Sequence, residues 1–411
     1  MRILHVVAGD LSGGAAKGAY ILHKELLKQG VNSTILSNSS FRISGDNSIF
    51  YVSKVNFSTF ISNLLWKALE RIQLFKYTNR MNRIFSTGFF GTNFLKYSVY
   101  READIVHLHW INAGLVDIKT LQSIDKPIVW TIRDMWPMTG GCHYTMGCDR
   151  FKVGCGKCPQ LGSLRLKDLS YDVIRRKEKY LQKDISIVGI SEWVSEMARV
   201  SFLFNDFEVI TINNGVDTSS FTRFSKEYAR NCLGISTKKR IILVGSAKLS
   251  DYYKGFEKFL ESLSYLNNEE CYLMFFGNID SNLFQTLNFE FNSLGYIDNY
   301  DRLSLAYSAA DVFVAPSIQE AFGKTIVESI ACGTPVVTFD VGGPKFIVSQ
   351  GITGYKAKPF DSRDLAIGIS WVLENIPEIN VSFCDDVRAN FDVYNIAGKY
   401  IDLYQKRING Q

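Results

Sequence analysis

The sequence predicts an α/β fold of two doubly wound, Rossmann-like domains in tandem, and three observations point to it. The length of 411 residues exceeds what one hydrophobic core usually holds and suits two domains of roughly 200 residues each. Short apolar runs alternate with helical segments, as in parallel sheets with crossover helices. The alternation restarts after the turn-forming stretch NNGVDTSSF, 213–221, and therefore occurs twice.

The apolar runs give the order of the elements. In the first half, strands are expected at 2–7, 32–37, 104–110, 127–132 and 185–191, with a helix at 18–29. In the second half, strands are expected at 240–246, 271–277, 291–297, 310–317 and 334–340, with helices at about 254–266, 300–309 and 323–332. A last helix is expected at roughly 393–408. We therefore predict a first domain over 1–217, a second over 218–392, and a C-terminal helical segment, 393–411, that packs on either domain, including back on the first.

Composition and the first residues predict a cytoplasmic chain. Hydrophobic residues make up 46% and charged residues 21%, which is typical of globular proteins. The N-terminal apolar run is too short for a signal peptide, and no run is long enough to span a membrane. Eight cysteines in such a chain are expected to be reduced thiols or metal ligands.

The net charge of +5 is concentrated in one segment, 54–101. This basic segment holds eight basic residues and one acid, Glu70, interleaved with aromatic residues such as Trp66 and Phe75. An interfacial helix on an anionic membrane has this pattern, and so does a core helix with a solvated basic face. Nucleic acid is not expected as a partner, because no recognition motif accompanies the charge.

Ligands of open parallel sheets bind beyond the carboxyl ends of the strands, so we expect a deep cleft between facing domains. In the first domain, Gly13 and Gly14 follow the first strand and let backbone approach a ligand. In the second, Lys248 and Lys254 can bring two cations to a diphosphate. Backbone N–H groups of 321–324 at a helix start add to this positive field, so no catalytic metal is required.

Two glutamates follow the strand at 310–317. Glu320 can accept hydrogen bonds from sugar hydroxyls, and Glu328 can bind both hydroxyls of a ribose. Two glutamates on an exposed helix are the simpler alternative, but the helix ESIACGTPVV is mostly apolar, and a buried carboxylate needs a partner.

With these residues in view, the chain resembles the family 4 retaining glycosyltransferases of the GT-B fold. The resemblance runs along nearly the whole sequence and includes the first glycine loop, NNGVD, KGF, YSAADVFVAPSIQEAFGKTIVESIACGTPVV, DVGG and GITGY. It implies that Glu320 lies by the donor sugar, that Glu328 binds the ribose, and that Lys248 and Lys254 bind the diphosphate. The backbone of Ala321, Phe322 and Gly323 would contact the phosphates and the sugar.

One position departs from the family pattern. Members often carry a histidine in a motif like HDMWPFTGGC, whereas this chain has RDMWPMTGGC with Arg133 in that place. Arginine is no base near neutral pH, so Arg133 is expected to bind a phosphate or an anionic sugar instead, and Asp134 to orient the acceptor. An altered or inactive enzyme is the alternative.

A cysteine-rich loop, 142–158, follows that motif. Cys142, Cys148, Cys155 and Cys158 lie within 17 residues, and Cys-Gly-Lys-Cys has the spacing that lets two thiolates reach one ion. We predict a structural zinc, with His143 as a substitute ligand, against the alternative of reduced thiols that pack a loop. The loop resembles the cysteine-rich insertion of polysaccharide-assembling family members. His107 and His109 are expected to be strand-end residues and not metal ligands.

Taken together, the sequence predicts a retaining, nucleoside-diphosphate-sugar-dependent hexosyltransferase that acts on a glycan acceptor, which we expect to be lipid-linked. The donor is expected to be of the UDP or GDP type, and the protein to sit on the inner face of the cytoplasmic membrane. Two other classes share parts of the pattern. A nucleotide-sugar sensor would have the donor site without turnover. A Rossmann oxidoreductase would need a glycine fingerprint and an acid after the second strand, which NSTILSNSS lacks.

Overall fold

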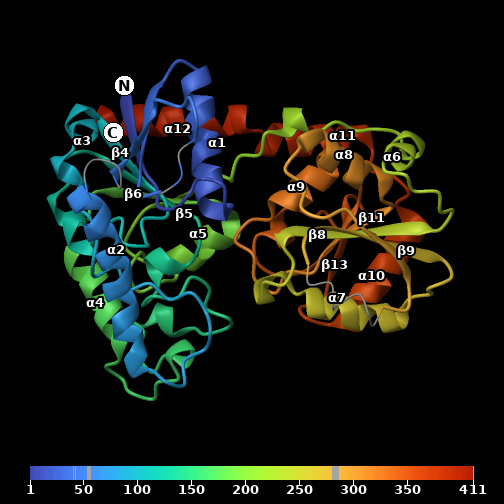
Figure 1. Ribbon diagram of the computed structural model, residues 1–411, viewed down its shortest axis with the longest axis horizontal. Helices are drawn as coiled ribbons and strands as arrows, with labels where there is room; N and C mark the ends of the chain where they lie inside the picture. Colours follow the sequence, from blue (N-terminus) through green and yellow to red (C-terminus); the bar gives the residue numbers. More distant parts are fainter. Residues whose placement is uncertain (40, 42, 53–56, 280–286, 411) are drawn as a thin grey trace. The chain divides into compact units, whose positions relative to one another are not determined.

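Across residues 1–39, 41, 43–52, 57–279 and 287–410, which the computed structural model describes, the chain forms two parallel β-sheets (Figure 1). The first sheet belongs to a compact unit of residues 1–215 and 396–411, and the second to a unit of residues 216–395. The predicted pair of doubly wound α/β units is confirmed. Lys54 of the basic segment lies outside the described residues.

The first sheet has seven strands in the order β3-β2-β1-β4-β5-β6-β7. Its strands are β1 (Arg2–Val6), β2 (Asn32–Ser37), β3 (Ile49–Tyr51), β4 (Ile105–Leu108), β5 (Ile128–Ile132), β6 (Ile185–Gly189) and β7 (Val209–Thr211). Its helices are α1 (Gly14–Lys28), α2 (Phe57–Ile72), α3 (Ser98–Glu102), α4 (Leu169–Tyr180) and α5 (Glu192–Arg199), together with most of α12 (Val393–Ile408).

Central strands of this sheet are buried on both faces, which is why they read as continuous apolar runs. All five residues of β5 are buried. Val129 packs in one cluster with Leu22 of α1 and Tyr404 of α12, whereas its neighbour Trp130 lines the opposite side with Lys177 of α4. Helices α1 and α12 thus share one face of the sheet.

The second sheet has six strands in the order β10-β9-β8-β11-β12-β13. Its strands are β8 (Arg240–Lys248), β9 (Cys271–Asn278), β10 (Glu290–Ser293), β11 (Val312–Ala315), β12 (Val336–Phe339) and β13 (Gly354–Ala357). Its helices are α6 (Lys226–Cys232), α7 (Phe256–Ser262), α8 (Tyr300–Ala309), α9 (Lys324–Ala331), α10 (Ser362–Asn375) and α11 (Val381–Phe391). Within this unit, α7 and α10 cover one face, and α8, α9 and α11 lie on the other (Figure 1).

Several elements differ from the sequence-based expectation. The strand expected at 291–297 is β10, which begins at Glu290 and ends at Ser293. It lies at the edge of its sheet and is mostly exposed. The prediction placed the end of the strand too late, because it included the apolar residues that follow β10. The helix expected from residue 18 begins at Gly14. Strands β3, β7 and β13 had not been predicted, because each is short and includes part-exposed residues, whereas β11, which is also short, is buried throughout.

No described helix has both the length and the apolar character that a membrane crossing requires.

Candidate functional site

The two glutamates lie in the second unit, and a neighbouring polar side chain contacts each of them. Glu320 lies in the loop after β11, and its Oε2 is 2.5 Å from Nζ of Lys254. Glu328 lies on the second turn of α9 and accepts a 2.9 Å hydrogen bond from the hydroxyl of Tyr307. Both carboxylates are half-buried. Burial, and next the charge of Glu328, raise the pKa of Tyr307 well above its ordinary value, so the phenol stays a donor.

Two consecutive glycines hold the backbone around Glu320. The N–H of Gly343 donates to the carbonyl of Glu320 at 2.9 Å. A Cβ on Gly343 would lie 2.5 Å from the carbonyl oxygen of Ala321 and 2.6 Å from Cα of Phe322. The DVGG loop after β12 therefore packs directly against the segment 320–323, and only a residue without a side chain allows this approach.

A second loop brings Lys254 to Glu320. The N–H of Ile318 donates to the carbonyl of Tyr253 at 2.8 Å. Gly255, with a φ of +63°, has its Cα so near Pro316 that a Cβ would lie 2.0 Å from the proline's carbonyl oxygen. The KGF turn is thus fixed beside the loop that carries Glu320.

Lys248 has a different neighbour. It ends β8 with a side chain that is 63% exposed, and its Nζ is 3.3 Å from Asp251. The two lysines predicted to bind a diphosphate therefore pair with separate carboxylates, Lys248 with Asp251 and Lys254 with Glu320. Their joint action on a ligand stays a prediction.

Gly13 and Gly14 lie at the N-terminus of α1, with Gly13 as its N-cap. A Cβ on either glycine would meet no protein atom within 4 Å. The packing of the described residues does not require glycine here, and the approach of a ligand to these two residues stays a prediction.

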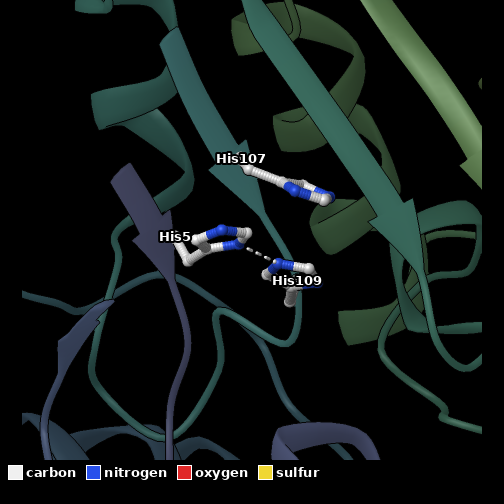
Figure 2. A group of neighbouring side chains, drawn as sticks. All are labelled: His5, His107 and His109. Carbon is white, nitrogen blue, oxygen red and sulfur yellow. Dashed lines mark hydrogen bonds between the residues drawn. The ribbon is translucent and has the colours of Figure 1, made fainter. Parts of the chain in front are cut away.

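Three histidines gather at the carboxyl ends of β1 and β4. His5 and His107 are paired in the register of these strands, and His109 lies two residues further on the same side. Figure 2 shows the three rings close together, with His5 Nδ1 and His109 Nε2 2.9 Å apart. In the described part of the chain, this is the one group of three or more possible metal ligands whose atoms all lie within 4.8 Å of one another.

The hydrogen bonds of this cluster do not fit a metal centre. The ring nitrogens of His107 contact Tyr404 and Thr131 at 2.6 and 2.7 Å. Both nitrogens of His109 are also engaged, and burial lowers the pKa of all three rings well below the ordinary value. They are neutral hydrogen-bonding groups, and His107 and His109 lie at the end of β4.

Arg133 points into this cluster. Its Nε donates to His109 Nδ1 at 3.2 Å, and its Nη1 donates to Asn214 at 2.9 Å. Because arginine only donates, the proton of His109 lies on Nε2 and is directed at His5. Burial lowers the pKa of Arg133 to about 10, which leaves it charged at neutral pH. Gly18 of α1 makes room for it, since a Cβ there would lie 2.4 Å from Nη1.

Asp134 is held by three groups. It accepts hydrogen bonds from the indole N–H of Trp110 at 3.0 Å and the backbone N–H of Trp136 at 2.9 Å. Its third contact is Nδ1 of His143 at 2.7 Å. The other ring nitrogen of His143 is 3.0 Å from the hydroxyl of Ser86. His143 is therefore committed to Asp134 and Ser86, and the expectation that it substitutes as a zinc ligand is not supported.

A buried lysine fixes the loop that carries Asp134. Nζ of Lys177 donates to the carbonyls of Trp136 and Thr139, the latter at 2.9 Å. It also lies 3.6 Å from the centre of the Trp136 ring. Burial lowers the pKa of Lys177 to about 7. The sequence reasoning missed this residue, because a lysine on an otherwise polar helix gives no sign of burial.

The four cysteines of the cysteine-rich loop line one small cavity of about 20 Å³. Burial raises the pKa of Cys155 to about 12 and that of Cys158 to about 11, so these thiols are neutral at pH 7. They do not form a group of ligand atoms within 4.8 Å of one another. Coordination of an ion would therefore require the thiols to move closer together.

The apolar side of α2 is exposed in the first unit. Phe60, Ile61, Leu64 and Leu65 are each 40 to 51% exposed. The sequence left two alternatives for the basic segment, an interfacial helix and a core helix with a solvated basic face. The second does not describe these residues, because their apolar side chains are exposed.

Comparisons with known proteins agree with this geometry. Residues 225–383, which include Lys248, Lys254 and both glutamates, match the family model of the glycosyl transferases group 1. A D-inositol 3-phosphate glycosyltransferase of Mycolicibacterium smegmatis is 27% identical over 292 residues, which cover 67% of this chain and 60% of the relative. The N,N'-diacetylbacillosaminyl-diphospho-undecaprenol alpha-1,3-N-acetylgalactosaminyltransferase of Campylobacter jejuni is 26% identical over 175 residues, which cover 42% of this chain and 46% of the relative.

The chain thus spans about half to three-fifths of the length of these curated relatives. Among solved structures, Anabaena Alr3699/HepE in complex with UDP has a TM-score of 0.65 at 16% identity, over 99% of this chain and all of that one. A structural similarity at such low sequence identity shows that the two proteins share a fold. Over residues 225–383 the chain therefore resembles the glycosyl transferases of group 1, and its two parallel sheets have the GT-B fold.

Proposed function

We propose that this protein is a retaining glycosyltransferase that moves a sugar from a UDP- or GDP-type sugar to a hydroxyl of a lipid-linked glycan. The observation that carries the proposal is the anchored glutamate pair within the segment that matches the family model. Glu328 offers two carboxylate oxygens to the hydroxyls of a ribose, and Glu320 faces the donor sugar.

The diphosphate would be neutralised by Lys248, Lys254 and the backbone of Ala321, Phe322 and Gly323. Lys254 holds Glu320 in the structure, and a diphosphate oxygen would compete for this ammonium. The role of these groups is to position the donor and to stabilise the negative charge of the leaving diphosphate, without a catalytic metal. In a retaining transfer the acceptor attacks from the face that the diphosphate leaves.

On the acceptor side, Asp134 would orient the attacking hydroxyl and Arg133 would bind a phosphate or an anionic sugar. Arg133 also supports the site from within, through His109 and Asn214. The name of the Campylobacter jejuni relative, which includes a diphospho-undecaprenol, supports a lipid-linked acceptor. The exposed apolar side of α2 supports peripheral contact with the inner face of the cytoplasmic membrane.

The donor site predicts stabilisation by one class of nucleotide. At about 100 times its dissociation constant, UDP or GDP should stabilise the fold by roughly 2.7 kcal/mol, which raises the melting temperature by several degrees. Glu328→Gln should lose most of this shift, because an amide is a weaker acceptor for ribose hydroxyls. The measurement is thermal unfolding with UDP, GDP, ADP and NAD.

Glu374→Gln is the matched control, since Glu374 is an exposed glutamate near the end of α10. A shift with NAD alone, or an equal shift in both variants, would contradict the donor-site assignment.

We also propose that the four cysteines of the cysteine-rich loop hold a structural zinc ion. They surround one cavity, which has room for a single ion, and zinc binding would deprotonate the thiols. Purified protein should contain about one zinc per chain, and Cys155→Ser/Cys158→Ser should lose it together with about 5 °C or more of melting temperature. Cys232→Ser, at an exposed thiol, is the control. Metal analysis that finds no zinc, with no loss of stability in the double variant, would mean that the thiols only pack the loop.

A further inference from the structure

The first unit contains a cationic cavity of about 670 Å³, which lies in the range of about 300 to 1,000 Å³ that is typical of ligand pockets. Its lining includes four basic residues, Lys67, Arg71, Arg80 and Arg83, which come from α2 and from the chain that follows it. Lys67 and Arg71 are four residues apart on α2 and therefore face the same side of the helix.

Three of these cations have no acidic partner among the described residues. Lys67, Arg71 and Arg80 form no ion pair with any acidic residue in the part of the chain that the structure describes. Glu70 is the one acid in the lining, and its Oε1 accepts the backbone N–H of Gly88 at 2.9 Å. Burial, and next the charge of Arg71, lower the pKa of Lys67. An anion with more than one negative charge would relieve this repulsion.

One wall of the cavity reaches the proposed acceptor site. Trp110 lines the cavity, and its indole N–H donates to Asp134. The remaining lining includes the aromatic side chains of Phe75 and Phe85. One part of a ligand in this cavity would thus contact the basic side chains, and another part would contact the apolar wall that leads to Asp134.

We propose that this cationic cavity binds the diphosphate of the lipid-linked acceptor. The isoprenoid chain would leave over the exposed apolar side chains of Ile72 and Phe75, which are 54 and 76% exposed. The sugar that carries the attacking hydroxyl would extend along Trp110 toward Asp134. This inference rests on the proposed transferase function and adds which chemical group of the acceptor is recognised and by which residues.

A diphosphate fits the cavity better than the headgroups of a bilayer surface. Four cations in one concave site match a group with two adjacent phosphates, whereas bilayer headgroups present single phosphates in a plane. The nucleotide is assigned to a separate site, since Glu320, Glu328 and Lys254 all lie in the other unit.

Binding of farnesyl diphosphate and farnesyl monophosphate to the full chain, measured by calorimetry in lipid-free buffer, tests the proposal. Farnesyl diphosphate should bind about tenfold or more tightly than the monophosphate, because charge-assisted hydrogen bonds to the second phosphate are lost. Arg71→Gln/Arg80→Gln should weaken farnesyl diphosphate binding by about tenfold or more. Lys76→Gln/Lys96→Gln is the matched control: it removes the same charge from two exposed lysines that do not line the cavity, and should change this binding little.

The outcomes separate this inference from the proposed function. Equal weakening in both double variants would mean attraction by net charge alone and would overturn the inference. The inference would also be overturned if farnesyl diphosphate fails to bind while vesicles of anionic phospholipid bind through the basic segment. If UDP or GDP still stabilises the chain through Glu328 in those cases, the transferase assignment stands and only the acceptor site is wrong.

Discussion

Lowering the pH from 7.5 to 5.5 should reduce the free energy of unfolding by about 5 kcal/mol. The cause is a set of four buried histidines, because the contribution of each to the free energy of unfolding falls by about 1.4 kcal/mol for every pH unit below 6.5. The four are His5, His23, His107 and His109. Burial lowers the pKa of each ring in the folded state, and for His23 to about 4. The unfolded chain therefore takes up these protons first. The histidine contribution is complete above about pH 6.5 and is lost as the pH falls toward the folded pKa values.

Other charged groups around the rings do not reverse the sign. Arg133 and the neighbouring histidines lower the pKa of His5, His107 and His109 further, and Asp46 only partly offsets burial at His23. Burial raises the pKa of Glu70, so its protonation favours the folded state as the pH falls. This opposite contribution comes from one residue, whereas four histidines destabilise the fold. Because small domains are stable by only about 5 to 15 kcal/mol, the first unit should approach unfolding near pH 5.

Urea unfolding at pH 7.5, 6.5 and 5.5 would measure the effect. His23→Gln provides an internal control, because removal of one of four buried rings should reduce the pH dependence by about a quarter. Unfolding curves that coincide at pH 7.5 and 5.5 would show that the rings are charged or exposed in the folded protein.

Gly343→Ala should abolish donor binding while the protein stays folded. The added Cβ would lie within 2.7 Å of three backbone atoms of Ala321 and Phe322, and backbone cannot rotate away as a side chain does. Since φ at this position is not in the left-handed region, the effect is displacement of the loop 320–323 and not strain at residue 343. A shift of about 1 Å in a positioning loop can reduce kcat/KM by about 100-fold.

The measurement is nucleotide binding, and transfer from the donor that binds, with circular dichroism as a check of folding. Gly398→Ala is the matched control, because Gly398 lies within α12 where a Cβ meets no atom within 4 Å. It should retain binding and gain roughly 0.5 to 1 kcal/mol of stability from the better helix former. If Gly343→Ala binds the nucleotide as the wild type does, the 320–323 loop does not form the donor site.

Glu320 and Glu328 show how far the sequence alone reaches. Their spacing and the apolar helix around Glu328 were enough to single them out, because a carboxylate near a buried helix needs a partner. The identity of those partners was not readable. Tyr307 lies 21 residues before Glu328, and Lys254 lies 66 residues before Glu320. Only the parallel order of β8, β11 and β12 brings these segments together.

The same distinction applies in the first unit. The sequence singled out Arg133 and Asp134 from a short motif, but it gave no sign that Asn214 and His109 receive the guanidinium, or that Trp110 and His143 hold the carboxylate. The cysteine spacing predicted a cluster, and all four thiols do line one cavity, although no metal geometry is formed.

The sequence by itself determined the two doubly wound α/β units, most of their strands and the glutamate pair, because apolar period and local motifs are properties of short segments. The tertiary structure alone decided which side chains meet: the histidine cluster across β1 and β4, the glycine loop under Glu320, and the cationic cavity between α2 and the chain beyond it. Such contacts depend on strand order and register, which join residues far apart in the chain and leave no periodic trace in it.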